Sequence, residues 1–284
     1  MSSNRLYARR TLSDTLNMVF DFVGENWRKW FKLMIYFLLP FSVLLGATIA
    51  TFYKDTEEFT MSTMGYVVSI ILFIVGCAVV TALEILLVKW HEDHNGTLDG
   101  CDAAGLWRMM PKTSLKCLGI IVLWSPVVAM ELVMILVPVI GLGFIFVMLP
   151  IFMTCPIMIL ESNNSISDMT KRAFSLGFKK WGTFILIAVV MVLVAVLINN
   201  AATFPLGLFK AFESLFEKST TADSMLWSFL ADVIRYVLCV AECFVIFVGI
   251  GMFVLAITFH YGSVATEAED LGLESDIDDF AKLK

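Results

Sequence analysis

The strongest constraint on this chain is a series of apolar runs that carry no charged residue and are long enough to cross a bilayer. The runs 33–53 and 61–83 hold no Asp, Glu, Lys or Arg. A hydrocarbon core about 30 Å thick needs about 20 apolar residues in a helix. Over the whole chain 59% of residues are hydrophobic and 16% are charged, whereas soluble domains average about 25% charged residues. We therefore expect an all-α polytopic membrane protein.

The apolar runs predict six transmembrane helices arranged as three hairpins. The run 117–160 contains one charge, Glu131, and is too long for one helix. We expect it to turn at Pro138, Gly141 and Gly143, because these residues disfavour a continuing helix. The expected spans are 33–53, 63–87, 117–138, 140–160, 181–205 and 237–259. The remaining parts are a segment 1–32 and an acidic tail 260–284, both expected in the cytoplasm.

The distribution of basic residues predicts how the chain is oriented. Under the six-span arrangement most of the 20 Lys and Arg residues lie on the side of the two termini, and the opposite loops hold only Lys54, Lys210 and Lys218. Short loops rich in Lys and Arg stay in the cytoplasm. We therefore expect a multi-pass membrane protein with both termini cytoplasmic. Topology and anionic lipid account for the basic clusters, so no nucleic-acid partner is expected.

Two similar segments, 12–27 and 166–181, each stand directly before a long apolar run. "TLSD" at Thr11–Asp14 and "SISD" at Ser165–Asp168 place a hydroxyl residue three before an acid, which is a helix-capping pattern. The apolar positions that follow helical spacing are Leu12, Leu16, Val19, Phe20, Val23, Trp27, Trp30 and Phe31 in the first copy, and Ile166, Ala173, Phe174, Gly177 and Trp181 in the second. Both segments are expected to be amphipathic helices at the membrane interface.

A weaker third copy, 97–112, precedes the third expected span. Its apolar stripe is incomplete, and Pro111 is expected to end the helix early. With this copy the chain reads as three units, each an interfacial helix followed by a transmembrane hairpin. The alternative is that any amphipathic segment before a span has this composition.

The run "CPIMILESNNSISDMTKRAFSLGFKKWGTF", 155–184, resembles uncharacterised bacterial membrane families that include the membrane domain of glycerophosphoryl diester phosphodiesterases. The positions that carry the resemblance are Pro156, Glu161, Ala173, Ser175, Leu176 and Trp181. The resemblance implies a six-span bundle of the bacterial cytoplasmic (inner) membrane rather than an activity, because in fused members the phosphodiesterase chemistry belongs to a separate soluble domain.

Residues that could support catalysis are few. His91 and His94 lie one helical turn apart and, with Asp99 or Asp102, could bind a metal. The alternative is that these residues only form the polar end of a transmembrane span. None of the six cysteines forms a CxxC pair, and thiols of this kind usually pack as small apolar groups. We therefore predict no metal, no cofactor and no enzymatic activity.

Polar residues inside the expected spans are the best indication of function, because charges in a membrane are costly unless paired or hydrated. Glu84 is expected to reach the interface. Six others are expected in the outer halves of the spans and could converge on one outward-facing cavity: Glu131, Asn199, Asn200, Asp232, Arg235 and Glu242. We expect Arg235 to pair with Glu131, Asp232 or Glu242. The alternative is an ion-paired packing cluster without a transport role.

Three classes of function are compatible with these features. The first is a non-enzymatic membrane protein that organises lipids or partner proteins, with membrane lipids as its expected contacts and its protein partners unknown. The second is a small transporter or permease subunit that uses the polar cluster. The third, an intramembrane enzyme, would need a metal or a nucleophile that the sequence does not reveal.

Overall fold

The computed structural model describes residues 6–54, 63–94, 96–134, 150–161, 165–219 and 225–269. Within these ranges the chain is built from helices, with no β-strand, which confirms the all-α prediction. The helices are α1 (Leu12–Lys54), α2 (Thr63–Asp93), α3 (Ala103–Met134), α5 (Thr154–Leu160), α6 (Ile166–Lys179), α7 (Trp181–Ser219) and α8 (Met225–Glu269).

Four of the described helices, α1, α2, α7 and α8, are long and apolar enough to cross a membrane. This supports a multi-pass membrane protein. The apolar helix Pro150–Leu160, which includes α5, is shorter than a span, and α3 is not among the four spans found in the described residues. The turn predicted at Pro138, Gly141 and Gly143 lies outside the described residues. Six spans in three hairpins therefore remain a prediction.

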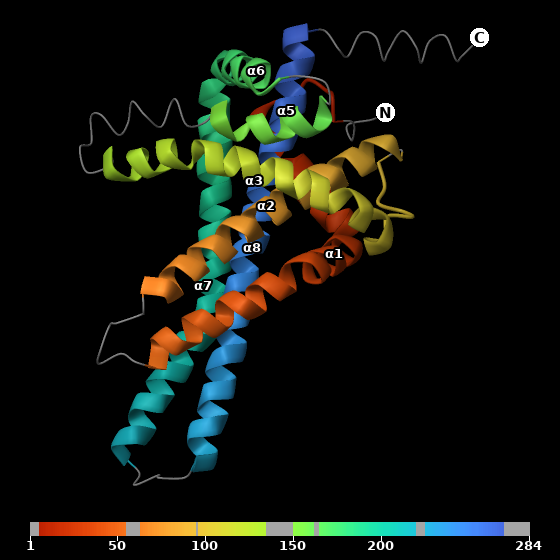
Figure 1. Cartoon of the computed structure of the whole chain (residues 1–284). Coiled ribbons are helices and arrows are strands. Elements are labelled where there is room, and N and C mark those ends of the chain that lie inside the picture. The colour runs from red at the N-terminus through yellow and green to blue at the C-terminus, as the bar shows by residue number, and fades with distance from the viewer. Residues whose placement is uncertain are drawn as a thin grey trace.

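Figure 1 shows how the helices are arranged. The long helices α7 and α8 run side by side in opposite directions, and α1 and α2 lie obliquely across them. The shorter α5 and the helix α3 lie crosswise to α7 and α8. We call the end of the bundle that carries α6 and the last turn of α8 the near end, and the end where α7 stops at Ser219 and α8 starts at Met225 the far end.

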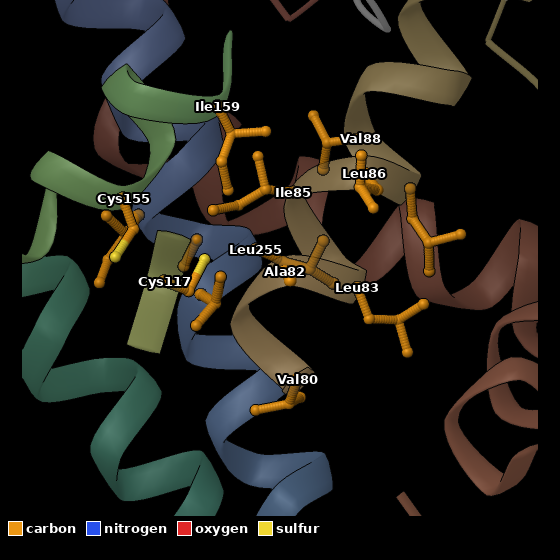
Figure 2. Packing of buried hydrophobic residues seen from close by; sticks show 14 of the residues in the cluster. Val80, Ala82, Leu83, Ile85, Leu86, Val88, Cys117, Cys155, Ile159 and Leu255 are labelled. Atoms are coloured by element: carbon orange, nitrogen blue, oxygen red, sulfur yellow. The ribbon is translucent and has the colours of Figure 1, made fainter. Parts of the chain in front are cut away.

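The best-packed part of the molecule is the near-end half of α2. Every residue from Val80 to Val88 is buried, because this half of α2 contacts α1, α3, α5 and α8. Figure 2 shows its side chains between Cys117 of α3, Cys155 and Ile159 of α5, and Leu255 of α8. A helix that is apolar on all sides is expected to be surrounded by other elements or by lipid. The near-end half of α2 is surrounded by other helices, and the other half exposes Val67, Val68 and Ile70.

The segment before α1 closes the near end. Leu6 is buried against α8, where a side chain at Gly262 would collide with the Leu6 carbonyl oxygen. The backbone N–H of Arg10 donates to Ser263 Oγ at 2.9 Å, and the Arg10 guanidinium lies 5.8 Å from the ring centre of Phe259. Burial lowers the pKa of Arg10 from its usual value. Residues 6–10 are therefore packed and hydrogen-bonded against the last turns of α8.

Both predicted capping patterns are confirmed. The backbone N–H of Asp14 donates to Thr11 Oγ1 at 3.3 Å, and Thr11 N–H donates to Asp14 Oδ2 at 3.1 Å. In the second copy the N–H of Asp168 donates to Ser165 Oγ at 3.3 Å. The reciprocal pair of bonds in the first copy and the single backbone bond in the second satisfy amide groups that the first turn of a helix leaves unpaired.

The two copies differ after their caps. The second forms the separate helix α6, which ends before α7 at Lys180. Its buried residues are Met169, Ala173, Leu176 and Gly177, so the buried side includes two of the predicted stripe positions and leaves Ile166 exposed. The first copy continues without a break into the apolar run, since α1 is one helix of 43 residues. The segment 12–32 therefore does not form a helix separate from the span 33–53.

Two boundary predictions were wrong. Pro111 lies inside α3 and does not end it; its ring removes one helical hydrogen bond, and the surrounding turns continue. The acidic tail was expected to leave the bundle at residue 260, but α8 continues to Glu269, and Tyr261, Val264, Ala265 and Thr266 are buried. Packing against the N-terminal segment and α6 holds these extra turns in the helix.

Candidate functional site

The predicted polar residues of α7 and α8 lie along the line where these two helices meet, which we call the polar seam. Arg235 is buried in it. Its guanidinium donates to Asp232 Oδ1 at 2.8 Å and forms an ion pair with Glu213 of α7. Asp232 was one of the three predicted partners. Glu213 was not predicted, because its place opposite Arg235 depends on the register between two antiparallel helices.

A second polar group lies closer to the middle of the helices. The Thr203 hydroxyl is 2.8 Å from the backbone carbonyl oxygen of Asn199 and 3.3 Å from Glu242 Oε1. A hydroxyl has one proton to donate, so the shorter contact within α7 competes with the contact to Glu242. Within the described part of the chain, Asn199 Oδ1 and Glu242 Oε2 are buried and have no hydrogen-bond partner. The seam therefore contains two unsatisfied acceptors, one on each helix.

The six predicted residues do not gather in one cavity among the described side chains. Arg235 and Glu242 are separated by seven residues of α8, about 10 Å along a helix, and they have different partners. Asn200 is exposed beside Asn199. The backbone of Glu131 belongs to α3, but its side chain lies outside the described part of the structure. The seam holds two separate polar groups, because residues spaced along two paired helices meet in successive layers.

An open groove of about 380 Å³ runs along α7 and α8 from the two asparagines toward the near end. Its lining residues are Met191, Val192, Ala195, Val196, Asn199, Asn200, Val245, Ile246, Gly249, Ile250 and Phe253. At its floor the helices approach closely, since a Cβ on Gly249 would lie 3.1 Å from the Cβ of Ala195. All lining side chains except the two asparagines are apolar, so the groove suits a hydrocarbon chain with a polar group at one end.

A second groove, of about 260 Å³, lies between α1, α2 and α8. Its polar residue is Ser69, whose hydroxyl is 2.9 Å from the carbonyl oxygen of Gly65 and 3.0 Å from Thr48 Oγ1. Unlike the groove on α7, this one therefore presents no unsatisfied buried acceptor among its described residues.

Glu84 does not reach the interface as expected. It is fully buried, and both carboxyl oxygens accept from Trp30 Nε1, at 2.9 and 3.0 Å. A Cβ on Gly251 of α8 would lie 2.8 Å from Glu84 Oε1. The carboxyl group is thus enclosed by α1, α2 and α8. Because Trp30 and Glu84 lie on different helices, 54 residues apart, their pairing depends on how α1 and α2 cross and could not be inferred from the sequence.

Glu161, which carries part of the family resemblance, organises the near end. It forms an ion pair with Arg172 of α6, with Nε and Oε2 2.7 Å apart, and it accepts a hydrogen bond from the Tyr261 hydroxyl of α8. The Tyr261 ring packs edge-to-face with Tyr7 at 6.4 Å, and burial raises the pKa of Tyr7. The Glu161 carboxylate therefore connects the end of α5 directly to α6 and α8. The contact between the Tyr261 and Tyr7 rings extends this connection to the N-terminal segment.

The two histidines of the possible metal site point to different surroundings. His91 packs edge-to-face on Phe22 at 5.0 Å, and His94 stacks on Trp90 at 4.0 Å. No group of three or more His, Cys, Asp or Glu suited to a metal occurs among the described residues. Cys101 is not expected to be a reactive thiolate, because burial and the neighbouring Asp102 raise the pKa of its thiol to about 11.

Comparisons with known proteins find no matching family model, no matching curated protein and no matching solved structure. The resemblance of residues 155–184 to the membrane domain of glycerophosphoryl diester phosphodiesterases therefore stays a prediction from the sequence.

Proposed function

We propose that this chain is a non-enzymatic integral membrane protein that organises lipids or partner proteins at the bacterial cytoplasmic membrane, with both termini in the cytoplasm. The observation that carries the proposal is the one-sided packing of α7. In the apolar stretch of α7 only 17% of residues are buried, against 56% in the apolar stretch of α2. Most of the apolar surface of α7 is therefore free to contact lipid or another protein.

The far end of the α7/α8 pair supports the same proposal. The charged side chains of Glu213 and Arg235 face the seam, while Phe204, Leu208 and Phe212 follow one exposed stripe of α7 with exposures of 65%, 46% and 59%. On α8, Phe229, Val233 and Val237 are exposed in the same spacing. A helical hairpin in water has the opposite arrangement, with apolar residues between its helices. The outer surface of this pair is thus suited to an apolar neighbour.

The length of the exposed apolar stripe indicates how much surface must be covered. Leu186 and Phe212 are both exposed on α7, and their 26-residue separation is about 39 Å along a helix. This exceeds a hydrocarbon core of about 30 Å unless the helix is strongly tilted. Lipid headgroups or a partner protein would contact the remainder.

Purification in a mild extraction medium that retains native lipids, followed by mass spectrometry, tests the proposal. The proposal expects defined lipids or a partner protein to be retained in constant ratio to the chain through successive columns. Two results would reject it: turnover of a small-molecule substrate by the purified chain, or the absence of any retained lipid or protein.

A second function, a small transporter or permease subunit, is favoured by the two unsatisfied acceptors of the polar seam. Asn199 Oδ1 and Glu242 Oε2 could bind a solute that donates hydrogen bonds. Solute uptake by vesicles containing the purified chain, with loss of uptake in Glu242→Gln, would support this function over the first.

A further inference from the structure

The groove on α7 and α8 differs from an ordinary lipid-facing surface because it ends at two buried acceptors that lack donors. A buried polar group without a partner is costly. Asn199 Oδ1 belongs to a groove-lining residue, and Glu242 Oε2 is held one layer farther toward the far end, where Thr203 contacts both residues. A ligand that satisfies them must supply N–H or O–H donors and no further acceptor at this point.

The depth of the two acceptors matches the position of a lipid headgroup. Trp181 begins α7 and is 45% exposed, and exposed Trp residues at helix ends mark the membrane interface. Asn199 lies 18 residues farther, about 27 Å along the helix. This places it close to the opposite boundary of a hydrocarbon core about 30 Å thick. The groove then extends from that boundary back toward the middle of the membrane.

The chemistry of the groove selects the rest of the ligand. From Asn199 toward Phe253 its lining is apolar, as an acyl chain descending from the far leaflet requires. One of the two acceptors is a carboxylate oxygen, which is satisfied best by a charged donor. An ammonium group has three N–H donors and no acceptor, so one such group carries enough donors for both oxygens. Lys210 is also within electrostatic range of Glu242, yet Oε2 has no hydrogen bond.

We propose that the groove between α7 and α8 binds one phospholipid of the far leaflet whose headgroup is a primary ammonium. Its acyl chain lies along Val192, Val196 and Ile250, and its ammonium donates to Asn199 Oδ1 and Glu242 Oε2. This inference deepens the lipid-organising function proposed above and rests on it. The groove between α1, α2 and α8, which has no unsatisfied acceptor among its described residues, binds acyl chains without regard to the headgroup.

The test uses two lipids with identical acyl chains, phosphatidylethanolamine and phosphatidylcholine. Both headgroups are positively charged at the amine, but the trimethylammonium of phosphatidylcholine has no N–H donor. The full chain, delipidated and mixed with equal amounts of both, is examined by native mass spectrometry. We expect the first bound lipid to be phosphatidylethanolamine by a ratio on the order of tenfold, which corresponds to about 1.4 kcal/mol of hydrogen bonding. Later lipids should bind without preference.

Two substitutions assign the preference to the groove. Asn199→Leu removes the amide acceptor and keeps the size of the side chain, and it should reduce the ratio several-fold. Asn200→Leu is the matched control, because it removes the neighbouring exposed amide and should keep the ratio. Glu242→Gln, which replaces one carboxylate oxygen by an amide donor, should also reduce the ratio of bound phosphatidylethanolamine to bound phosphatidylcholine. This variant is the test if Asn199→Leu fails to fold.

The outcomes separate this inference from the proposed function. Equal binding of both lipids by the unmodified chain would overturn the site while leaving retained lipid as support for the broader proposal. A preference that persists in both Asn199→Leu and Glu242→Gln would also overturn the site, because neither acceptor would then be involved. If the chain retains neither lipid, the proposed lipid-organising function fails together with the site.

Discussion

Two carboxyl groups, Glu161 at the near end and Glu242 in the polar seam, differ in how fully their oxygens are hydrogen-bonded. At the near end, Glu161 bonds to Arg172 and Tyr261, and the backbone of Arg10 bonds to Ser263. In the middle of the α7/α8 pair, Asn199 and Glu242 each keep a buried oxygen without a hydrogen-bond partner among the described residues, whereas Arg235 at the far end pairs with Glu213 and Asp232. Satisfied networks fix one arrangement of a fold, whereas an unsatisfied group is a common place for a ligand. We therefore expect the contacts of Glu161 to stabilise the fold and the oxygens of Asn199 and Glu242 to be available to a ligand.

The largest expected effect comes from removing the last turns of α8. Truncation after residue 259 deletes Tyr261 and Val264, which are buried, and the Gly262 surface on which Leu6 packs. Burial of each such side chain contributes about 1.5–3 kcal/mol, so we expect loss of folded protein. Truncation after residue 269 should be tolerated. The monodisperse fraction after detergent extraction distinguishes them, and equal recovery of the two truncated chains would show that the near end does not hold the fold.

A substitution at the crossing of α1 and α8 is expected to have the next largest effect. A Cβ on Gly46 would lie 2.6 Å from the Val240 side chain and 2.8 Å from its backbone, so Gly46→Leu forces the helices apart. Overpacking of this kind typically costs about 1–3 kcal/mol. Gly24→Leu on the same helix is the control, because nothing lies within 4 Å of a Cβ there. Thermal unfolding in detergent should show a lower midpoint for Gly46→Leu alone; matching midpoints would remove this crossing from the account.

Loss of the buried hydrogen bond between Trp30 and Glu84 is expected to have a similar or smaller effect on stability. Trp30→Phe removes the indole donor and leaves the buried carboxyl group unpaired, at a cost of about 1–3 kcal/mol. Trp107→Phe, at a residue that is 59% exposed, should cost much less. Adding Glu84→Leu to Trp30→Phe should recover part of the loss, since it removes the unpaired group. Additive losses in the double variant would mean that the two side chains are not coupled.

The smallest stability effect is expected at the far end. Glu213→Gln removes one of the two acids that pair with Arg235, but Asp232 remains at 2.8 Å. The side chain of Asp232 is 39% exposed, so water also reaches this group. We expect a loss of about 1 kcal/mol or less. The midpoint of thermal unfolding in detergent measures the loss of stability. A larger loss for Glu213→Gln than for Trp30→Phe would show that the far-end ion pairs stabilise the fold more than the buried Glu84 contact does.

The sequence predicted the features that depend on local order along the chain. Helical class, long apolar helices and the caps at Thr11 and Ser165 follow from composition and from residues within one turn. The partner of Arg235 and the donor to Glu84 could not be predicted, because each depends on the register and crossing of helices distant in sequence. Two further features were not predicted: α1 continues without a break at residue 32, and α8 continues beyond residue 260. In both cases the helix extends beyond its apolar run, because no helix-breaking residue ends it there and because its extra turns pack against other elements.

The central claim is that the exposed apolar stripe at the far end of α7 is covered in the membrane by lipid or protein. Phe212 lies on this stripe, and Ser214 is exposed on another side of α7. The direct measurement is labelling of Phe212→Cys and Ser214→Cys by a water-soluble maleimide in opened native membranes, in a chain whose native cysteines are replaced. We predict rapid labelling at position 214, protection at position 212, and equal labelling after denaturation. Equally rapid labelling of both positions in the native membrane would contradict the claim.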